Sequence, residues 1–356
     1  MGSMTTQYSG TPAQPSKRAT IIDVAARAGV SKSLVSLAFK DPQRVSDARL
    51  KLIRTAASEL NYSPSFVAQS LTSQQSPFIG ILVLDFQNPL FIEVADAVRR
   101  TLVEYGEFGL LLNGSSTATV SEPYGTLDPQ VLRMLHSLRP RALVVVGTAA
   151  DQNALPADIP VVYVSAAITR GVATCIRADD EAGMELLVEH LVTAGHQRLG
   201  YITGSSGAVT QERQAAFESS VSARDLEFLL LPGDYTEQGG YRAGQNLLTL
   251  PEEQRPTAVI AVNDIAALGF MRAVEEAGLT VPDDVAVAGF DNIFLAGIPR
   301  VGLTSVDPNK DELGRQAALA ALAGAKGEVD EAQYLLVEPI LVIRASSTGS
   351  LRYHPS

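Results

Sequence analysis

A single segment near the start of the sequence constrains the fold more than any other. Residues 20–40 read TIIDVAARAGVSKSLVSLAFK. Thr20 and Asp23 have the spacing of a capping box, which begins a helix. Gly29 can adopt the positive φ that a sharp helix end requires, and Ser31 can cap a second helix directly after it. The segment therefore predicts two short helices joined by a tight turn.

The side chains of these two helices fall into a buried set and an exposed set. Helical spacing predicts burial of the apolar side chains of Val24, Ala25, Ala28, Val30, Val35 and Ala38. The second helix keeps polar donors on its outer face, namely Lys32, Ser33, Ser36 and Lys40. Such a helix can enter the major groove of DNA and contact base edges. An ordinary helical hairpin is the alternative, but the combination of caps, corner glycine and outward donors favours a DNA-reading helix-turn-helix.

The distribution of charge supports this interpretation, although the chain of 356 residues carries a formal net charge of −11. Residues 1–60 hold nine Lys or Arg and four Asp or Glu, a balance of +5, whereas the remainder holds 19 and 35, a balance of −16. A basic head on an acidic body is typical of a nucleic-acid reader joined to a domain of another kind. The acidic body should repel phosphate and leave DNA contact to the head.

The sequence after the second helix predicts a third helix and then a connection. Ser46 can cap a helix that we expect over 47–60. Its buried side is expected to hold Leu52, Ile53, Ala56, Ala57 and Leu60. The next segment, 64–76, begins with Pro64, which suits the first turn of a helix, but it is short for an isolated helix. It fits either a helix that folds only when something holds it or a plain linker.

From Phe78 onward the sequence alternates short apolar runs with helical patterns. Near-continuous apolar strands separated by helices predict parallel sheets covered on both faces. About 270 residues of this pattern exceed one comfortable sheet, so we expect two lobes. Ligands bind such sheets beyond the carboxyl ends of the strands. Residues 85–91, Asn263, Asp264 and Asp291 directly follow predicted strands, so we expect them near a common cleft.

Several function classes find no support in the sequence. The histidines lack the spacing of metal ligands; they are His136, His190, His196 and His354. No nucleophile elbow, P-loop or G-x-G-x-x-G loop occurs, no apolar run reaches the roughly 18–20 residues of a membrane span, and the N-terminus has no secretory pattern. With Cys175 as the single cysteine, a reduced cytoplasm is expected. We therefore expect neither enzymatic activity nor a cofactor, metal or membrane partner.

Both halves of the sequence together resemble the LacI family of bacterial transcription regulators, from residue 18 to residue 346. The most specific stretches lie in the head, with IDVAARAGVS at 22–31 and VSDARLKLIRTAASELNYSP at 45–64. The body contributes NPLF at 88–91, AGHQRLGYITG at 194–204, RPTAVIAVND at 255–264, GLTVPDDVAVAGFD at 278–291 and LTSVD at 303–307. The resemblance therefore covers nearly all of the sequence outside its two ends.

The resemblance implies an N-terminal all-α helix-turn-helix head with a hinge helix, followed by an α/β two-lobed body like a type I periplasmic binding protein. The implied ranges are a disordered tail at 1–17, the DNA-binding head at 18–63, the hinge helix and linker at 64–76, an effector-binding and dimerisation domain at 77–346, and a C-terminal tail at 347–356. The first lobe is expected at 77–176 and 306–334, and the second at 177–305 and 335–346.

The resemblance also implies the residues that contact DNA. Positions that match phosphate contacts are Thr20, Ser31, Ser46 and Tyr62, and positions that match base contacts are Lys32 and Ser33, with Ser36 and Lys40 on the same helix. Leu37 departs from the arginine of most members and offers only apolar contact, for example to a thymine methyl group. Arg44 contacts the DNA backbone or a base, or is a solvated charge. Ala68 and Gln69 lie in the implied hinge helix, and Leu71 matches the leucine that wedges between base steps.

For the effector cleft, the resemblance implies eight residues, which are Asn88, Leu90, Phe91, Ser165, Arg213, Tyr235, Asn263 and Asp291. Phe91 stacks on a ring of the effector or belongs to the core. Arg213 anchors the effector through its guanidinium group, or forms an ion pair with Glu212 or another neighbour. Asp291 accepts a hydrogen bond from the effector or caps the following turn.

Taken together, these features predict a cytoplasmic, nucleoid-associated, homodimeric repressor that binds a pseudo-palindromic double-stranded operator and responds to a small polar metabolite. Ser165 and Pro308 replace an aspartate and a glutamine that many sugar-binding members have, which argues against a simple hexose. Sugar, polyol, nucleoside and purine effectors all stay open, as do induction and co-repression. A transport-type binding protein without DNA function is the alternative, and it would need an export signal.

Overall fold

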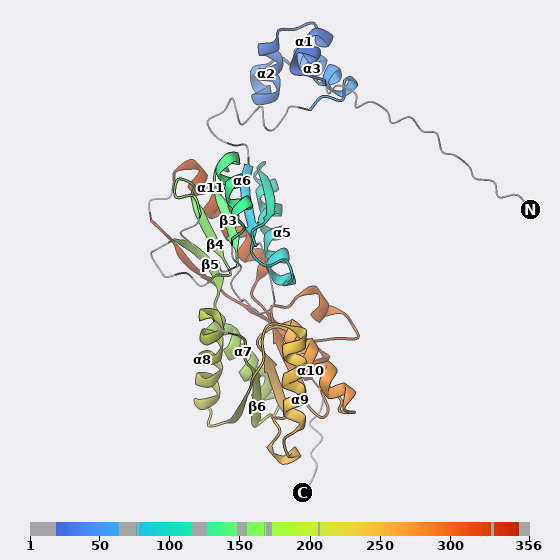
Figure 1. The fold of residues 1–356 in the computed structure, drawn as a ribbon, viewed down its shortest axis with the longest axis vertical. Helices are drawn as coiled ribbons and strands as arrows, with labels where there is room; N and C mark the ends of the chain where they lie inside the picture. Colours follow the sequence, from blue (N-terminus) through green and yellow to red (C-terminus); the bar gives the residue numbers. More distant parts are fainter. Residues whose placement is uncertain are drawn as a thin grey trace, which may run out of the picture. The chain divides into compact units, whose positions relative to one another are not determined.

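The computed structural model describes residues 19–63, 76, 78–115, 127–147, 155–166, 168, 173–205, 207–328 and 331–348. The chain divides into two compact units, residues 1–74 and residues 75–356, which we call the head and the body (Figure 1). In the described ranges we find no helix with the length and hydropathy that a membrane crossing requires. Most of the expected hinge segment, including Ala68, Gln69 and Leu71, lies outside the described residues.

The described part of the head consists of α1 (Ile21–Ala28), α2 (Lys32–Lys40), the 3-10 helix η1 (Pro42–Arg44) and α3 (Asp47–Glu59). Both bonds of the capping box form: the Asp23 N–H donates to the Thr20 hydroxyl, and the Thr20 N–H donates to the Asp23 carboxylate at 2.7 Å. Gly29 ends α1 with φ +67°, and Ser31 caps α2 by accepting from the Leu34 N–H at 3.2 Å. The predicted helix-turn-helix is confirmed.

The head closes around one small core. Its buried members are Val24, Ala25, Val35, Ala38, Val45, Ile53, Ala56 and Ala57. Two expectations for α3 are wrong. Leu52 is 56% exposed, because the buried face of α3 follows Ile53, Ala56 and Ala57 and Leu52 lies one position outside it. Ser46 occupies the N-cap position without a side-chain capping bond, and Asp47 complements the positive end of the helix instead.

The body contains two sheets, each with helices around it (Figure 1). The first has the order β11-β5-β4-β3-β1-β2 and is parallel throughout; its strands are β1 (Phe78–Val83), β2 (Phe108–Asn113), β3 (Leu143–Val146), β4 (Val161–Val164), β5 (Thr174–Ala178) and β11 (Tyr334–Val337). The helices around it are α5 (Pro89–Glu104), α6 (Pro129–Leu138) and α11 (Lys310–Lys326). We call this part lobe 1.

Lobe 2 has the strand order β12-β10-β9-β8-β6-β7, in which only β12 runs antiparallel to its neighbour. Its strands are β6 (Arg198–Ile202), β7 (Glu227–Leu231), β8 (Ala258–Ala261), β9 (Ala286–Phe290), β10 (Thr304–Asp307) and β12 (Ile340–Val342). Its helices are α7 (Asp180–Thr193), α8 (Ala208–Ser222), α9 (Glu237–Leu248) and α10 (Asp264–Glu276), with short 3-10 helices η3 (Glu252–Gln254), η4 (Phe294–Gly297) and η5 (Ala345–Ser347). The predicted two-lobed α/β architecture is confirmed.

The described chain passes between the lobes after β5, after β10 and after β11. These strands end at Ala178, Asp307 and Val337, close to the lobe boundaries proposed at about residues 176, 305 and 334. Ala178 pairs with Val337, Asp307 pairs with Ile340, and the Asn309 side chain donates to the backbone oxygen of Glu338 at 3.3 Å. The three crossings therefore lie near one another.

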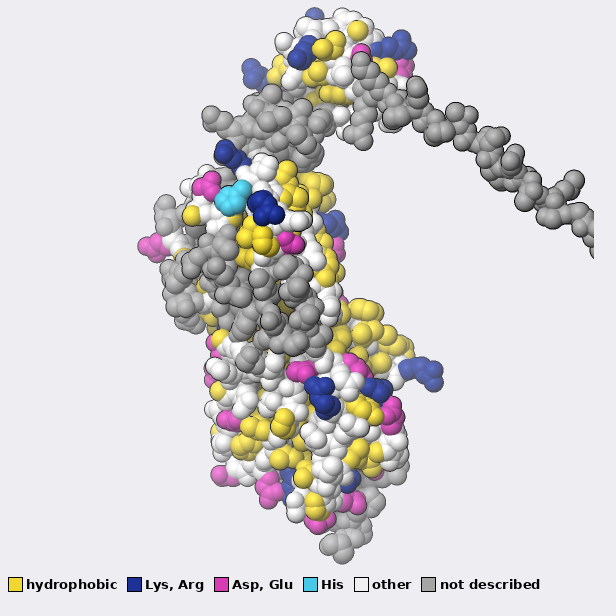
Figure 2. Space-filling view, viewed as in Figure 1, with side chains coloured by type: hydrophobic (Ala, Val, Ile, Leu, Met, Phe, Trp, Pro, Cys, Tyr) yellow, Lys and Arg dark blue, Asp and Glu magenta, His cyan; other side chains and the backbone are white. Residues whose placement is uncertain are grey.

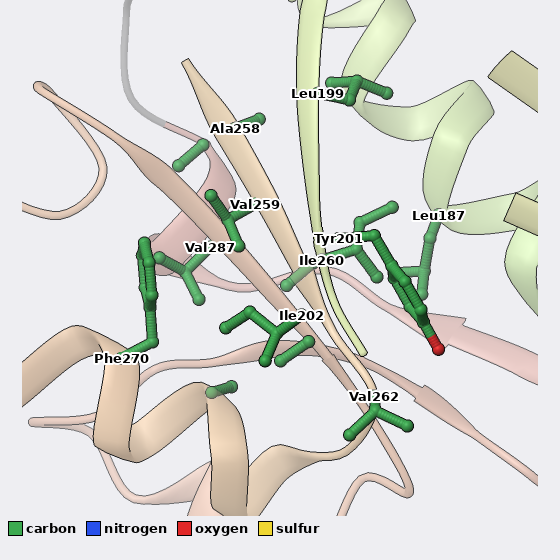
Figure 3. Packing of buried hydrophobic residues seen from close by; sticks show 14 of the residues in the cluster. Leu187, Leu199, Tyr201, Ile202, Ala258, Val259, Ile260, Val262, Phe270 and Val287 are labelled. Atoms are coloured by element: carbon green, nitrogen blue, oxygen red, sulfur yellow. The ribbon is translucent and has the colours of Figure 1, made fainter. Parts of the chain in front are cut away.

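Apolar side chains cover the sheets on both faces. Along β1, Ile79 and Ile81 face a cluster with α5 and α11, whereas Leu82 faces a second cluster that includes Leu135 of α6. This alternation on a parallel strand is the burial on two sides that near-continuous apolar runs predict. Figure 3 shows the corresponding core of lobe 2, in which Tyr201, Ile202, Val259, Ile260 and Val287 from adjacent strands pack with Leu187 of α7 and Phe270 of α10.

Glycines allow α9 and α10 to pack in close contact. A Cβ atom at Gly240 would lie 1.8 Å from the backbone oxygen of Ala266, and one at Gly269 would lie 1.8 Å from the backbone oxygen of Glu237. A third glycine of α9, Gly244, faces Ala273 in the same way. The backbones of the two helices thus touch, and neither has room for a side chain at these positions.

Gly240→Ala is expected to lower the free energy of unfolding of the body by about 1–3 kcal/mol, because the added methyl group must push the two helix backbones apart. The better helix propensity of alanine offsets only about 1 kcal/mol. Gln245→Ala, at an exposed position of the same helix, is the control and should change the stability little. Urea unfolding followed by circular dichroism measures both, and equal midpoints for the two variants would contradict this account of the packing.

Candidate functional site

The outer face of α2 is open and carries hydrogen-bond donors. Lys32, Ser33 and Ser36 are exposed there, and Lys32 has no ion-pair partner among the described residues of the head. Figure 2 shows further Lys and Arg side chains at the surface of the head. Lys40 ends α2, but its side chain is not described. The structure therefore presents three of the four predicted donors to solvent, as contact with a groove requires.

The predicted phosphate contacts lie at the starts of the helices. Thr20, Ser31 and Ser46 are the N-cap residues of α1, α2 and α3, and all three are exposed. Helix N-termini attract anions because their first N–H groups lack partners and the helix dipole is positive there. Arg44 is exposed as well, with its Nε atom 3.9 Å from a carboxylate oxygen of Asp41, so its charge is only loosely paired.

Two predicted DNA contacts are partly taken up by packing. Leu37 is partly buried and packs against the head core, so only part of its surface remains for the apolar base contact expected of it. Tyr62 packs against the same core, and its ring lies edge-on to that of Phe39 with the centroids 5.9 Å apart. Burial raises the pKa of the Tyr62 hydroxyl, which therefore stays protonated and able to donate.

In the body, Arg213 of α8 lies buried beyond the carboxyl ends of the lobe 2 strands. Its Nε atom donates to Asp180 at 2.6 Å, and its Nη1 atom donates to the backbone oxygen of Val262, which follows β8, at 2.9 Å. Its guanidinium carbon lies 3.8 Å from the centroid of the Phe290 ring. Of the alternatives left open by the sequence, an ion pair has formed, but with Asp180 rather than with Glu212.

Asp291 is the second buried charge of this cluster. It follows β9 with φ +103°, a strained value for a residue other than glycine. Its Oδ1 atom is buried without a hydrogen-bond partner and lies 3.7 Å from Nη1 of Arg213. Burial raises the pKa of Asp291 to about 6, and the nearby charges of Arg213 and Lys310 offset this only in part. A buried acceptor with no donor is costly, and a ligand that donates a hydrogen bond relieves the cost.

Asn263 and Tyr235 are joined to each other. The Asn263 side chain caps α10 by accepting from the Ala266 N–H at 2.9 Å, and its Nδ2 atom donates to the backbone oxygen of Tyr235 at 3.1 Å. The Tyr235 hydroxyl shares a 2.9 Å hydrogen bond with Thr210 of α8. Both predicted effector residues thus lie at the strand ends of lobe 2, with part of their hydrogen-bonding capacity already used by the protein.

The predicted residues of lobe 1 lie at the ends of β1 and β4. Asn88 caps α5 by accepting from the Leu90 N–H at 3.0 Å, while the Leu90 side chain is buried in the lobe 1 core, which favours a packing role for it. Phe91 is partly buried against the same core, and Ser165 has φ +52° at the end of β4. Among the described residues, no hydrogen bond or ion pair joins the side chains of this group to Arg213 or Asp291.

The sequence reasoning missed three charged residues of this region, which are Arg177, Asp180 and Lys310. Asp180 begins α7 and is held by Arg177 of β5 at 2.5 Å and by Arg213. Lys310 begins α11, and its Nζ atom donates to the backbone oxygens of Asp291 and Asn292 at 2.8 and 2.6 Å. Arg177 and Asp180 lie on either side of the passage after β5, and Lys310 follows the passage after β10. Charged residues at or just beyond the ends of apolar strands were the available signal.

These charges also fix each other's protonation. Burial alone would raise the pKa of Asp180, but Arg213 and Arg177 outweigh it and hold this pKa below its usual value. Asp264, which accepts from the Ser305 hydroxyl at 2.6 Å and the Ile293 N–H at 2.8 Å, has its pKa raised well above the usual value by burial and by Asp291. Within the described ranges, no cluster of His, Cys, Asp and Glu could hold a metal ion.

Comparison with known protein families assigns both units. The family described as bacterial regulatory proteins, lacI family, matches residues 20–65, and the periplasmic binding protein-like domain matches residues 188–347. The HTH-type transcriptional repressor PurR of Photobacterium profundum is 31% identical over 337 residues, which cover 92% of this chain and 98% of the relative. The ribose operon repressor of Haemophilus influenzae is 30% identical over 334 residues, with coverages of 92% and 98%.

Solved structures agree with this assignment. A lac repressor dimer bound to operator and the anti-inducer ONPF has a TM-score of 0.78 at 26% identity and covers 94% of this chain and all of its own. A LacI family regulator from Enterococcus faecium with bound ribose has a TM-score of 0.65 at 25% identity and covers 77% of this chain and all of its own. The likeness to the first structure thus extends over head and body alike.

Asp291→Asn tests the buried carboxyl group. The pKa of Asp291, about 6 in the folded chain, lies above the value of about 4 in an unfolded chain. The folded wild type therefore gains stability as the pH falls through 6 and loses it as the pH rises, whereas the asparagine variant does not. Between pH 7 and pH 5 we expect wild type to gain about 1 kcal/mol over the variant. Urea unfolding at pH 5, 6 and 7 measures this gain, and a constant difference would contradict the assignment.

Proposed function

The chain belongs to the lacI family of bacterial regulatory proteins, and we propose that it is a transcriptional repressor that binds operator DNA as a dimer and is controlled by a small-molecule effector. The observation that carries the proposal is the open donor face of α2, on a helix-turn-helix head whose chain continues into a body with a buried polar site. We also propose that the protein binds DNA at the nucleoid, in the cytoplasm, and we propose no catalytic reaction for it.

In this proposal α2 enters the major groove of each operator half-site. Lys32 and Ser33 read base edges, while Thr20, Ser31 and Ser46 at the helix starts contact phosphates and fix the register of the head. The exposure of these five side chains supports their assignment. Leu37 brings no hydrogen-bond donor to the groove, so the base opposite it is read by apolar contact or not at all.

We propose that residues 64–76 form the family's hinge helix on operator DNA, with Ala68, Gln69 and Leu71 on its minor-groove side. A wedge of leucine between base steps costs unstacking but bends the duplex and widens the contact surface. A short segment that folds only when DNA and a second head hold it responds to small shifts of the body. In this way the body would control the affinity of the head for DNA.

We propose that the effector binds among the strand ends of the body. Arg213, Asp291, Tyr235 and Asn263 would contact it from lobe 2, and Asn88, Phe91 and Ser165 from lobe 1. An effector that contacts both lobes favours one arrangement of the lobes over another, and this preference is what shifts the population of dimers competent for DNA. Such a shift requires a differential affinity of only a few kcal/mol.

Lys32→Ala is expected to weaken binding to the operator about tenfold or more, because a base contact contributes roughly 1–3 kcal/mol. The operator is first selected with the wild-type chain from a pool of random duplexes, and affinity is then measured by gel shift at fixed salt. Lys51→Ala removes an exposed lysine of α3 outside the reading face and is the matched control, with a smaller effect that is uniform across sequences. Failure of wild type to enrich any sequence, with or without cell extract added, would refute the proposed function.

Leu71→Ala is expected to weaken operator binding strongly while leaving the thermal unfolding of the body unchanged, since the residue would act only when inserted into DNA. Circular permutation gel shifts of the bound operator should also show a smaller bend with the variant. Equal affinity and equal bend for wild type and variant would remove Leu71 from the proposed DNA contacts.

A further inference from the structure

A cluster of four charges, three buried and one exposed, lies where the chain passes from lobe 1 to lobe 2. Arg177 of β5 pairs with Asp180 at 2.5 Å and with Glu212 at 2.6 Å, and Asp180 pairs in turn with Arg213 at 2.6 Å. Arg177, Asp180 and Arg213 are each less than 9% exposed. Two cations and two carboxylates are thus balanced within one contact network beside Asp291.

Two nitrogens of the Arg213 guanidinium group already donate to the protein itself. Its Nε atom is bound to Asp180, its Nη1 atom is bound to the backbone oxygen of Val262, and the Phe290 ring lies against its plane. A carboxylate or phosphate group of a ligand is the usual partner of such a fork. Here the carboxylate of Asp180 takes the place of a ligand. An anionic ligand would therefore have to break the buried ion pair between Asp180 and Arg213, or lie beside the negative charge of Asp180.

The other cation near Asp291 is occupied as well. Lys310 donates to the backbone oxygens of Asp291 and Asn292 and to the Asp307 carboxylate at 3.1 Å. It is also 3.6 Å from Glu93 of α5. Among the described residues around Asp291, each cation therefore already has carboxylate partners, and no surplus positive charge remains for an anion.

What remains unsatisfied in this cluster is an acceptor. The Oδ1 atom of Asp291 is buried, has no hydrogen-bond partner, and is 3.7 Å from the Arg213 nitrogen nearest to it. A hydroxyl or N–H group of a ligand would donate a hydrogen bond to this oxygen, whereas a phosphate or carboxylate oxygen would be repelled by its negative charge. The cluster therefore favours a ligand that donates a hydrogen bond to Asp291 and disfavours an anionic ligand.

We propose that Asp180 acts as a charge filter in the effector site: by occupying Arg213 it excludes phosphorylated and carboxylated metabolites and leaves the site to uncharged ligands that donate hydrogen bonds to Asp291. Neutral sugars or polyols and neutral nucleosides share this chemistry. The inference rests on the proposed function, because it assumes that the effector binds at these residues, and it narrows the range of effectors.

The test compares neutral compounds with their own phosphate esters on the full-length chain. Thermal shift and calorimetry are run with ribose and ribose 5-phosphate, adenosine and adenosine 5′-monophosphate, and inorganic phosphate alone. We expect wild type to bind neither ester and to bind inorganic phosphate no more tightly than a chain without this site. If either pair contains a ligand, we expect that ligand to be the neutral compound, ribose or adenosine. A wild-type chain that binds an ester more tightly than its neutral parent, or that binds inorganic phosphate more tightly than the double variant Asp180→Asn/Arg213→Met does, overturns the proposal.

Asp180→Asn keeps the shape of the side chain and removes its charge, so Arg213 loses its closely bound carboxylate and keeps only the Asp291 oxygen at 3.7 Å. We expect this variant to bind inorganic phosphate at least tenfold more tightly than wild type, and the gain to vanish in the double variant Asp180→Asn/Arg213→Met. The double variant separates this site from the basic head. Glu185→Gln is the matched control, because Glu185 is also a carboxylate of α7 paired with an arginine, Arg224, outside the cluster, and it should give no gain.

A folded Asp180→Asn variant without a gain in phosphate affinity also overturns the proposal. If that variant does not fold, the wild-type comparison decides alone. All of these measurements use small molecules without DNA, whereas the proposed function is tested by operator selection. A chain that binds its operator but prefers anionic ligands therefore rejects only the charge filter.

Discussion

The buried ion pair between Asp180 and Arg213 is the interaction on which the organisation of the body depends. Asp180 is the first residue of α7, directly after the chain has left β5 of lobe 1, and Arg213 reaches it from α8. Because Arg177 of lobe 1 holds the same carboxylate, the pair connects the two lobes through one side chain. Breaking a buried pair by removing one partner leaves an uncompensated charge, which costs about 3–5 kcal/mol. The junction is therefore well defined in geometry and sensitive to what binds beside it.

Much of the head could be predicted from the sequence because its determinants are local. The capping box of Thr20 and Asp23, the left-handed Gly29 and the cap at Ser31 act within three or four residues, so their consequences can be read directly from spacing. Leu52 shows the limit of this reasoning. Several residues of α3 are apolar, and only packing against α1 and α2 decides which of them face inward.

The body shows the same division. The runs of apolar residues predicted the strands of the two sheets. The helices α9 and α11 could not be predicted in the same way, because their buried faces consist largely of glycine and alanine, such as Gly240, Gly244, Ala317 and Ala321. Asn263 and Asp291 follow β8 and β9, as their places after apolar runs indicate, whereas the pairing of Arg213 with Asp180 could not be foreseen from the sequence. That pairing joins residues 33 positions apart on two helices and depends on how the helices pack.

The interleaved order of the strands has a consequence for biosynthesis. Strand β11, at residues 334–337, completes the lobe 1 sheet beside β5, and β12, at residues 340–342, completes the lobe 2 sheet beside β10. During translation β5 and β10 have no neighbour on that side until β11 and β12 leave the ribosome, and unpaired strands of this kind are prone to aggregation. The head, complete by residue 62, needs no such partner. In a nascent polypeptide the DNA-binding head can therefore fold before the effector-binding body that controls it is complete.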